Sequence, residues 1–118
     1  MIYAITPVPA PRMTQADKWQ KRACVMRYFN FKDEVKKANI IIPESPFITF
    51  YIPMPPSWKE KKREKMVNQP HLQTPDIDNL TKALLDSVYK NDSHIWDIRA
   101  RKLWGRDGCI HITQMEDL

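Results

Sequence analysis

Long hydrophobic runs are absent from this sequence. The longest aliphatic stretch is residues 40–42, and the mixed apolar segment at 47–52 extends it only loosely. A membrane-spanning helix needs roughly 20 apolar residues, so neither segment can cross a bilayer. Residues 1–5 also lack the basic flank and long apolar stretch of a signal peptide. We therefore expect a soluble, cytoplasmic protein without a membrane partner.

Cysteine is also scarce, and the two cysteines, Cys24 and Cys109, stand far apart. No pair of cysteines or histidines has the short C-x-x-C or H-x-x-x-H spacing that is usual in zinc sites. We expect ordinary buried thiols and no zinc. Internal repeats, low-complexity tracts and domain linkers are lacking too, so residues 1–118 are expected to form a single domain. A fold of this size has little interior for a deep cavity, which favours a shallow site on a large substrate.

The charge balance is basic. Lys and Arg total 19 against 14 Asp and Glu, which gives a net charge of +5. Such an excess is compatible with nucleic-acid binding, although many basic proteins bind none. The positive charges gather in two blocks, Lys59, Lys61, Lys62, Arg63, Lys65 and Arg99, Arg101, Lys102, Arg106. An acidic cluster lies between the blocks, so we expect a polyanion at the flanks and a divalent cation in the middle.

The first half of the chain predicts strands and helices separated by prolines. Residues 1–6 are rich in strand formers, and prolines then extend the chain toward Arg12. Apolar residues recur at helical intervals over 15–38, with Thr14 as a plausible N-cap. Residues 47–52 are apolar on both faces, which is typical of a strand covered on both sides. Ser57 has the form of a capping box and predicts a short basic helix to about residue 67.

The second half predicts a helix followed by two strands. Residues 68–75 read as a loop, and Asp78 reads as the N-cap of a helix that runs to Tyr89. Residues 94–104 alternate, which places Trp96 on the buried face of a strand. Residues 105–108 form a turn, and 109–115 return as a strand, so these two strands should form a hairpin. The fold class is thus α/β (α+β), one domain with a mixed sheet of about four strands and about three helices.

Asp76 and Asp78 form the most distinctive motif of the chain. In an extended segment alternate side chains point to one side, so Ile77 can enter the core while both carboxylates emerge together. Two adjacent carboxylates repel unless a cation lies between them. Mg²⁺ commonly takes one or two carboxylates together with water and phosphate oxygens. The alternative is structural, since Asp before a helix is a common N-cap.

Three further residues favour a metal site over a simple helix cap. Lys82 lies one helical turn after Asp78 and could reach the carboxylates or a phosphate beside them. Asp86 lies a further turn along that face and could hold Lys82 in position. Asp92 follows the helix and could fold back as a third acidic ligand.

The same segment resembles the RusA family of Holliday-junction resolvases. It reads Pro75-Asp76-Ile77-Asp78-Asn79-Leu80-Thr81-Lys82, then Leu85-Asp86, then Asn91-Asp92-Ser93. The family pattern is D-[hydrophobic]-D-N-L-x-K, then a helical Asp and an acidic pair. Two positions depart from this pattern. Asn91 stands in place of the first paired acid, and residues 73–75 replace arginines that some members carry.

The resemblance implies a function. It implies a homodimer of small α/β subunits that cuts four-way DNA junctions by paired symmetric nicks, in DNA recombination and repair. Asp76, Asp78 and Asp92 would hold Mg²⁺, with Mn²⁺ as a substitute ion, and Lys82 would be the catalytic lysine. No organic cofactor is implied. The chemistry would be metal-assisted phosphodiester hydrolysis.

DNA affinity is expected to come from phosphate contacts that weaken steeply with salt. The candidate residues are Arg12, Lys59, Lys61, Lys62, Arg63, Arg99, Arg101 and Lys102. The block at 59–65 is equally compatible with a solvated helix face. Trp58, Trp96 and Trp104 are expected in the core and not as base-stacking platforms.

Two other functions remain open from the residues alone. One is a metal nuclease that acts on other branched DNA or on duplex, because its carboxylate chemistry would be the same. The other is a non-catalytic DNA-binding module that uses only the basic blocks, for which Mg²⁺ would be irrelevant.

Overall fold

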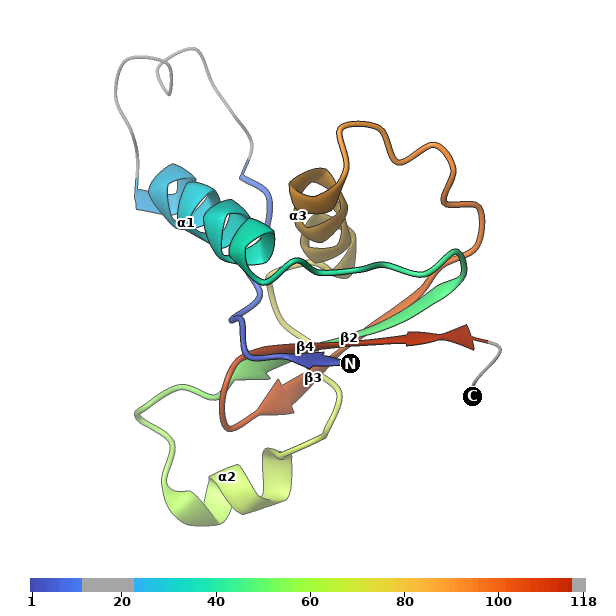
Figure 1. The fold of residues 1–118 in the computed structure, drawn as a ribbon. Helices are drawn as coiled ribbons and strands as arrows, with labels where there is room; N and C mark the ends of the chain where they lie inside the picture. Colours follow the sequence, from blue (N-terminus) through green and yellow to red (C-terminus); the bar gives the residue numbers. More distant parts are fainter. Residues whose placement is uncertain (12–22, 116–118) are drawn as a thin grey trace.

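A computed structural model describes residues 1–11 and 23–115 of the chain. Its elements are β1 (Ile2–Tyr3), α1 (Ala23–Lys37), β2 (Pro46–Pro53), α2 (Glu60–Met66), α3 (Ile77–Val88), β3 (Arg99–Gly105) and β4 (Cys109–Gln114). A four-stranded mixed sheet and three helices within the described ranges confirm the predicted α+β fold class (Figure 1). Arg12, Thr14 and the predicted helical residues 15–22 lie outside the described residues.

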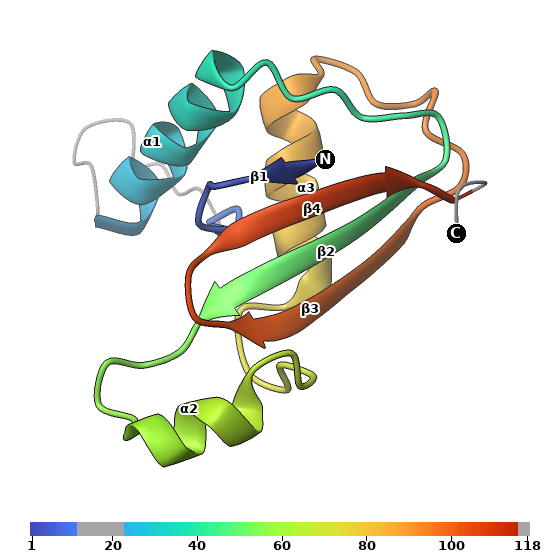
Figure 2. The ribbon, with the colours of Figure 1, turned by 60° about the horizontal axis from the view of Figure 1, so that its bottom comes forward.

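The most apolar strand, β2, lies inside the sheet. The strand order is β1-β4-β2-β3, with β2 parallel to β3 and antiparallel to β4 (Figure 2). The predicted hairpin of the last two strands is therefore wrong, because β2 separates them. A central position buries the apolar side chains of β2, such as Ile48 and Phe50, most completely. β3 carries Arg99 and Arg101 and lies at the edge, where charged side chains suit solvent and discourage further pairing.

The connection from β3 to β4 crosses the end of β2, and glycine makes this crossing possible. A Cβ at Gly105 would stand 2.9 Å from Tyr51 Cβ, and a Cβ at Gly108 would stand 2.7 Å from Thr6 Cα. Both distances are shorter than side chains tolerate, so the chain passes here only because neither residue has a side chain.

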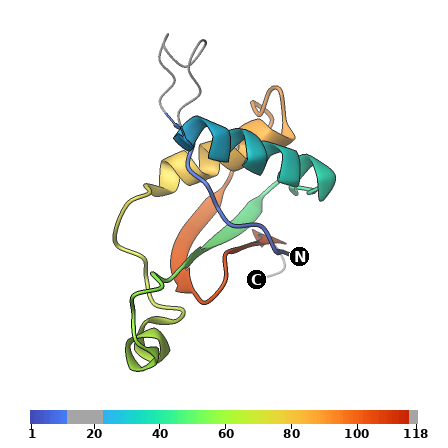
Figure 3. The ribbon, with the colours of Figure 1, turned by 90° about the vertical axis from the view of Figure 1, so that its left-hand side faces the viewer.

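The core lies between α1, α3 and one face of the sheet (Figures 1 and 3). Its buried members are Tyr28, Phe31 and Val35 from α1, Leu80, Ala83, Leu84 and Leu85 from α3, and Ile48, Phe50, Ile110 and Ile112 from the sheet, joined by Ile5, Ile40 and Ile42. In β2 these are the even-numbered residues, as expected when successive side chains alternate between faces. None of the helices in the described residues covers the opposite face of the sheet (Figure 2).

The helix α2 begins later than expected and lies beyond the end of the sheet (Figure 2). Its first residue is Glu60, and Lys59, not Ser57, is the N-cap, without a side-chain capping bond. The cause is a preceding turn, in which the Trp58 amide donates to the Pro55 carbonyl at 3.1 Å. Trp58 packs on the buried Trp104, with ring centroids 4.7 Å apart, which agrees with the predicted packing role of both rings.

Trp96 departs from the prediction, since it is 71% exposed. The strand expected over 94–104 begins only at Arg99, which pairs with Phe47 near the start of β2. Residues before Arg99 therefore have almost no partner strand. Residues 93 and 94 form a turn, and residues 95–98 have no regular secondary structure. The Trp96 indole donates to Glu44 Oε1 at 3.4 Å.

No helix within the described ranges is long and apolar enough to span a membrane. Cys24 and Cys109 are both free thiols and only partly buried, so the expectation of buried thiols holds only in part. Burial and the nearby Asp107 raise the pKa of Cys109.

Candidate active site

The two acidic residues of the motif lie where a loop enters α3. Asp76 is the N-cap residue in extended conformation, and Asp78 belongs to the first helical turn. The predicted cap at Asp78 is therefore wrong by two residues. The Asp76 side chain makes no capping hydrogen bond either. Both carboxylates are exposed, while Ile77 between them packs against the core.

Asp78, Lys82 and Asp92 line one pocket, which we call the Asp78 pocket. Its volume is about 400 Å³, and it lies between α3, the loop after α3 and the edge strand β3. The lining residues are Ile77, Asp78, Thr81, Lys82, Leu85, Asp92, Ile98 and Ala100. A carboxylate pair and an ammonium group thus face an otherwise largely apolar wall.

Asp92 reaches this pocket through the turn that follows α3. The Asn91 side chain accepts a hydrogen bond from the Ser93 amide at 2.9 Å, and the Asp92 carbonyl accepts one from the Ile95 amide at 2.9 Å. These bonds fix the backbone on both sides of Asp92 without using its carboxylate. Asn91, which stands where the RusA pattern has an acid, thus has a structural role of its own.

Asp76 lines a separate pocket of about 370 Å³, which we call the Asp76 pocket. Its lining residues are Pro9, Ala10, Thr74, Pro75, Asp76 and Asn79. The proline-rich segment is attached here by a hydrogen bond from the Ala10 amide to the Asn79 carbonyl at 3.2 Å. Asp76 and Asp78 do not share a pocket, because the chain turns into the helix at Ile77 and the alternation of an extended segment ends there.

Lys82 is exposed and is not held by the neighbouring acids. No ion pair within 4.0 Å joins it to Asp78 or Asp86 in the part of the chain that the structure describes. The expectation that Asp86 positions Lys82 is therefore corrected. Both charges act on Tyr28 of α1, whose pKa is raised by burial first and by Asp86 second, while Lys82 lowers it.

Lys102 braces the loop that leads to Asp76. Its ammonium donates hydrogen bonds to the carbonyls of Gln73 and Pro75, the latter at 2.7 Å. Sequence reasoning assigned this lysine to DNA and missed the brace. The sequence does indicate the direction of this side chain. Lys102 lies two residues after Ala100 in β3, so both side chains point to the face that the helices cover.

His71 lies under the same loop and is almost fully buried. Its ring centroid is 4.2 Å from that of Trp104, and its Nδ1 has no hydrogen-bond partner. Burial and then the positive charge of Lys102 lower the pKa of His71. The histidine is therefore a neutral packing residue.

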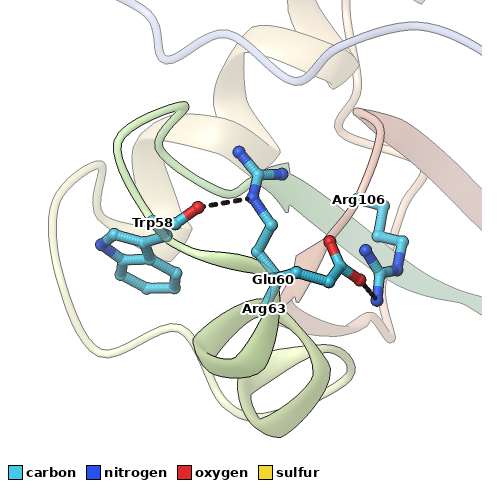
Figure 4. A network of polar contacts seen from close by, with 4 residues as sticks. All are labelled: Trp58, Glu60, Arg63 and Arg106. Atoms are coloured by element: carbon cyan, nitrogen blue, oxygen red, sulfur yellow. Dashed lines mark hydrogen bonds and ion pairs between the residues drawn. The ribbon is translucent and has the colours of Figure 1, made fainter.

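The basic block of α2 is partly used within the protein. Arg63 donates from Nε to the Trp58 carbonyl at 3.0 Å (Figure 4). It also donates from a terminal nitrogen to the Pro55 carbonyl at 2.9 Å. The Lys62 ammonium lies 4.1 Å from the centroid of the Trp58 ring. Lys59, Lys61 and Lys65 are exposed. Of the predicted phosphate contacts in this block, Arg63 is the one held by the protein's own carbonyls.

Arg106 joins α2 to the turn between β3 and β4. It forms an ion pair with Glu60 at 2.8 Å (Figure 4). The hydrogen bond from Arg106 lowers the pKa of Glu60. Both side chains are largely exposed, so this pair orients α2 more than it stabilises the fold.

The donor set of the two pockets suits a hard cation. Neither pocket is lined by cysteine or histidine, so the side chains that could ligate a metal offer oxygen. Within the described residues, no group of three or more His, Cys, Asp or Glu side chains is close enough to hold a metal ion. Asp78 and Asp92 form a pair on one pocket, and a pair with water and phosphate oxygens meets the usual requirement of Mg²⁺.

Comparison with known proteins assigns this sequence to a family. The family model described as Endodeoxyribonuclease RusA matches residues 4–114, nearly the whole chain. A search of curated proteins finds no match. The motif residues Asp76, Asp78, Lys82 and Asp92 all fall within the matched range. The chain therefore belongs to the RusA family of endodeoxyribonucleases, which are Holliday-junction resolvases.

Proposed function

We propose that this protein is a Mg²⁺-dependent, structure-selective endodeoxyribonuclease that resolves four-way DNA junctions by paired symmetric nicks, in DNA recombination and repair. Mn²⁺ would substitute for Mg²⁺. The observation that carries the proposal is the meeting of Asp78, Lys82 and Asp92 on one pocket beside an edge strand. Membership of an endodeoxyribonuclease family supports catalysis over passive DNA binding.

Asp78 and Asp92 would hold the cation, and Asp76 would contribute from the Asp76 pocket at the start of the same helix. When bound, Mg²⁺ supplies Lewis acidity toward a phosphoryl oxygen. Both carboxylates of the Asp78 pocket are free of ion pairs within 4.0 Å in the described residues. Bringing a cation between them therefore breaks no ion pair within this part of the chain.

Lys82 would bind the scissile phosphate and stabilise the negative charge that develops on it during hydrolysis. Its ammonium is exposed on the same pocket as the two carboxylates and has no acidic partner within 4.0 Å there. Leu85 and Ala100 form part of the apolar wall. Such a wall lowers the local dielectric and strengthens the lysine–phosphate attraction.

A homodimer follows from the shape of the substrate. A four-way junction has near two-fold symmetry, so two coordinated cuts require two active sites that are related in the same way. Each subunit would supply one set of Asp76, Asp78, Lys82 and Asp92.

The test compares a four-way junction, a fork and a linear duplex of shared sequence, each with Mg²⁺ or with EDTA. We expect paired nicks in the junction with Mg²⁺ only. Asp78→Asn should lower the cleavage rate by about 100-fold or more, because several kcal/mol of charge stabilisation depend on the cation. Junction binding in EDTA should persist.

Asp33→Asn is the matched control, since Asp33 is exposed on α1 and lines neither the Asp78 pocket nor the Asp76 pocket. It should cleave as the unaltered protein does. Equal cutting of all three substrates would replace the resolvase with a general nuclease. If the protein binds DNA but does not cut it with Mg²⁺ or with Mn²⁺, it is a DNA-binding module, and the proposal is overturned.

A further inference from the structure

Two arginines lie on the sheet face that no helix covers. In β3, Arg99 and Arg101 alternate with Ala100, whose side chain packs against the core. They therefore point away from α1 and α3. Together with neighbours on β2 and β4 they line an open pocket of about 370 Å³, which we call the arginine pocket. Its lining residues are Phe47, Thr49, Arg99, Arg101, His111 and Thr113.

The two guanidinium groups are positioned by the sheet. Arg99 and Arg101 lie over the Phe47 ring, with guanidinium carbons 4.7 and 4.9 Å from its centroid. Arg101 Nε also donates to Thr49 Oγ1 at 3.0 Å, and Thr49 is only 1% exposed. β2 is thus covered on its second side by arginine and not by another helix. Each guanidinium has five N–H donors, so most of them remain free.

Within residues 1–11 and 23–115, the positive charge of this pocket has no counter-charge. No carboxylate lines the pocket, and neither arginine forms an ion pair within 4.0 Å in the described residues. Two neighbouring cations repel each other unless an anion joins them. Planar guanidinium groups match the oxygens of a phosphate in a bidentate geometry. The chemistry of the pocket therefore favours phosphate.

The arginine pocket and the Asp78 pocket lie back to back across β3. Ile98 and Ala100 line the Asp78 pocket, while Arg99 and Arg101 line the arginine pocket. β3 is an edge strand. Residues 68–71 form backbone hydrogen bonds only with its second half, at Lys102 and Trp104. The half that contains Arg99 and Arg101 is an open edge that separates two surfaces.

We propose that the arginine pocket binds the phosphate backbone of a junction arm other than the arm that is cut. The edge of β3 would then lie between two diverging arms, with the scissile phosphate on one face and the second arm on the other. The proposal rests on the proposed function. It explains selectivity for branched DNA, because one straight duplex cannot lie on both faces of a sheet.

The test measures DNA binding in EDTA by the double variant Arg99→Gln, Arg101→Gln over a range of salt concentrations. Junction affinity should fall by about 10- to 100-fold, and the slope of log affinity against log salt should flatten by about 1.8, since two phosphate contacts are lost. Affinity for linear duplex should change much less. The matched control is Lys36→Gln, Lys37→Gln, which removes the same charge from the exposed end of α1.

The outcomes separate this proposal from the proposed function. If the double arginine variant has the junction affinity and salt slope of the control variant, the arginine pocket does not bind DNA. That result would overturn this proposal even if the unaltered protein cleaves junctions normally. An equal loss for duplex and junction would overturn the second-arm assignment. Conversion of a dimer to a monomer would make the face a subunit interface and would also overturn it. Arg99→Gln alone, which leaves the Thr49 bond intact, repeats the measurement if the double variant unfolds.

Discussion

Lys82 and Lys102 are two lysines with opposite environments. Lys82 is exposed on the Asp78 pocket and has no acidic partner within 4.0 Å in the described residues. Lys102 is half-buried, and its ammonium is bound by two backbone carbonyls. A lysine that is already hydrogen-bonded inside the protein must give up these bonds to contact DNA. Lys82 is therefore available to a phosphate, and Lys102 fixes the loop.

Lys102→Met is expected to destabilise the fold by about 1 kcal/mol, because two carbonyls at the protein surface lose a charged donor. Urea unfolding followed by circular dichroism measures this change. Lys90→Met is the control, since Lys90 is exposed and outside the site. A stability of Lys102→Met equal to that of the control would show that the brace contributes nothing.

At the scale of elements, His71 in the connection from α2 to α3 makes the stability of the fold depend on pH. Burial and Lys102 lower the pKa of His71 below its ordinary value of 6.5. The unfolded chain therefore binds a proton near pH 6.5, where the folded chain does not. The free energy of unfolding should fall as the pH decreases below 6.5 and should be insensitive to His71 above it.

The measurement is the urea midpoint at pH 7.5 and at pH 5.5, for the unaltered protein and for His71→Phe. Phe keeps the ring that packs on Trp104 and removes the titrating group. His94 and His111 are present in both proteins, so their contribution cancels. An identical pH dependence in the two proteins would contradict a buried neutral His71.

The elements that the sequence predicts well are those in which local pattern and burial agree. β2 and α3 have strong apolar patterns, and both occur close to their expected bounds. Pairing was harder to predict, because a short glycine-containing turn ordinarily joins neighbouring strands. Here Gly105 lets that turn cross β2. The apolar Trp96 also resembled a core residue, although its segment has almost no partner strand.

The residues of the site were easier to identify than their arrangement. Asp78, Lys82 and Asp92 do face one pocket, as their spacing along and after a helix indicates. The separation of Asp76 depends on the residue at which the helix begins, and a sequence leaves such boundaries uncertain by one or two residues. Once β3 is located, the opposite directions of the Arg101 and Lys102 side chains follow, because successive side chains of a strand point to opposite faces.

On the scale of the whole molecule, the paired-nick proposal makes a prediction for mixed dimers. A dimer of one unaltered subunit and one Asp78→Asn subunit should nick a single strand, because each subunit supplies one active site. A supercoiled plasmid with an extruded cruciform gives linear DNA after paired nicks and a nicked circle after one nick. Sedimentation should give twice the 14.0 kDa chain mass. Linear product from the mixed dimer, or a monomer at working concentration, would contradict paired action.

The strand order also has a consequence for how the chain folds. The first strand pairs with the last, and the Met1 amine donates to the Ile112 carbonyl at 2.7 Å. The partners of β2 lie about fifty residues later along the chain. No two paired strands of the described sheet are joined by a tight turn, because even the consecutive strands β2 and β3 are separated by α2 and α3. Loop closure must therefore precede most of its stabilising contacts, and such topologies fold more slowly than those built from local hairpins. We expect the helical pair α1 and α3 to be ordered only when the sheet beneath them assembles.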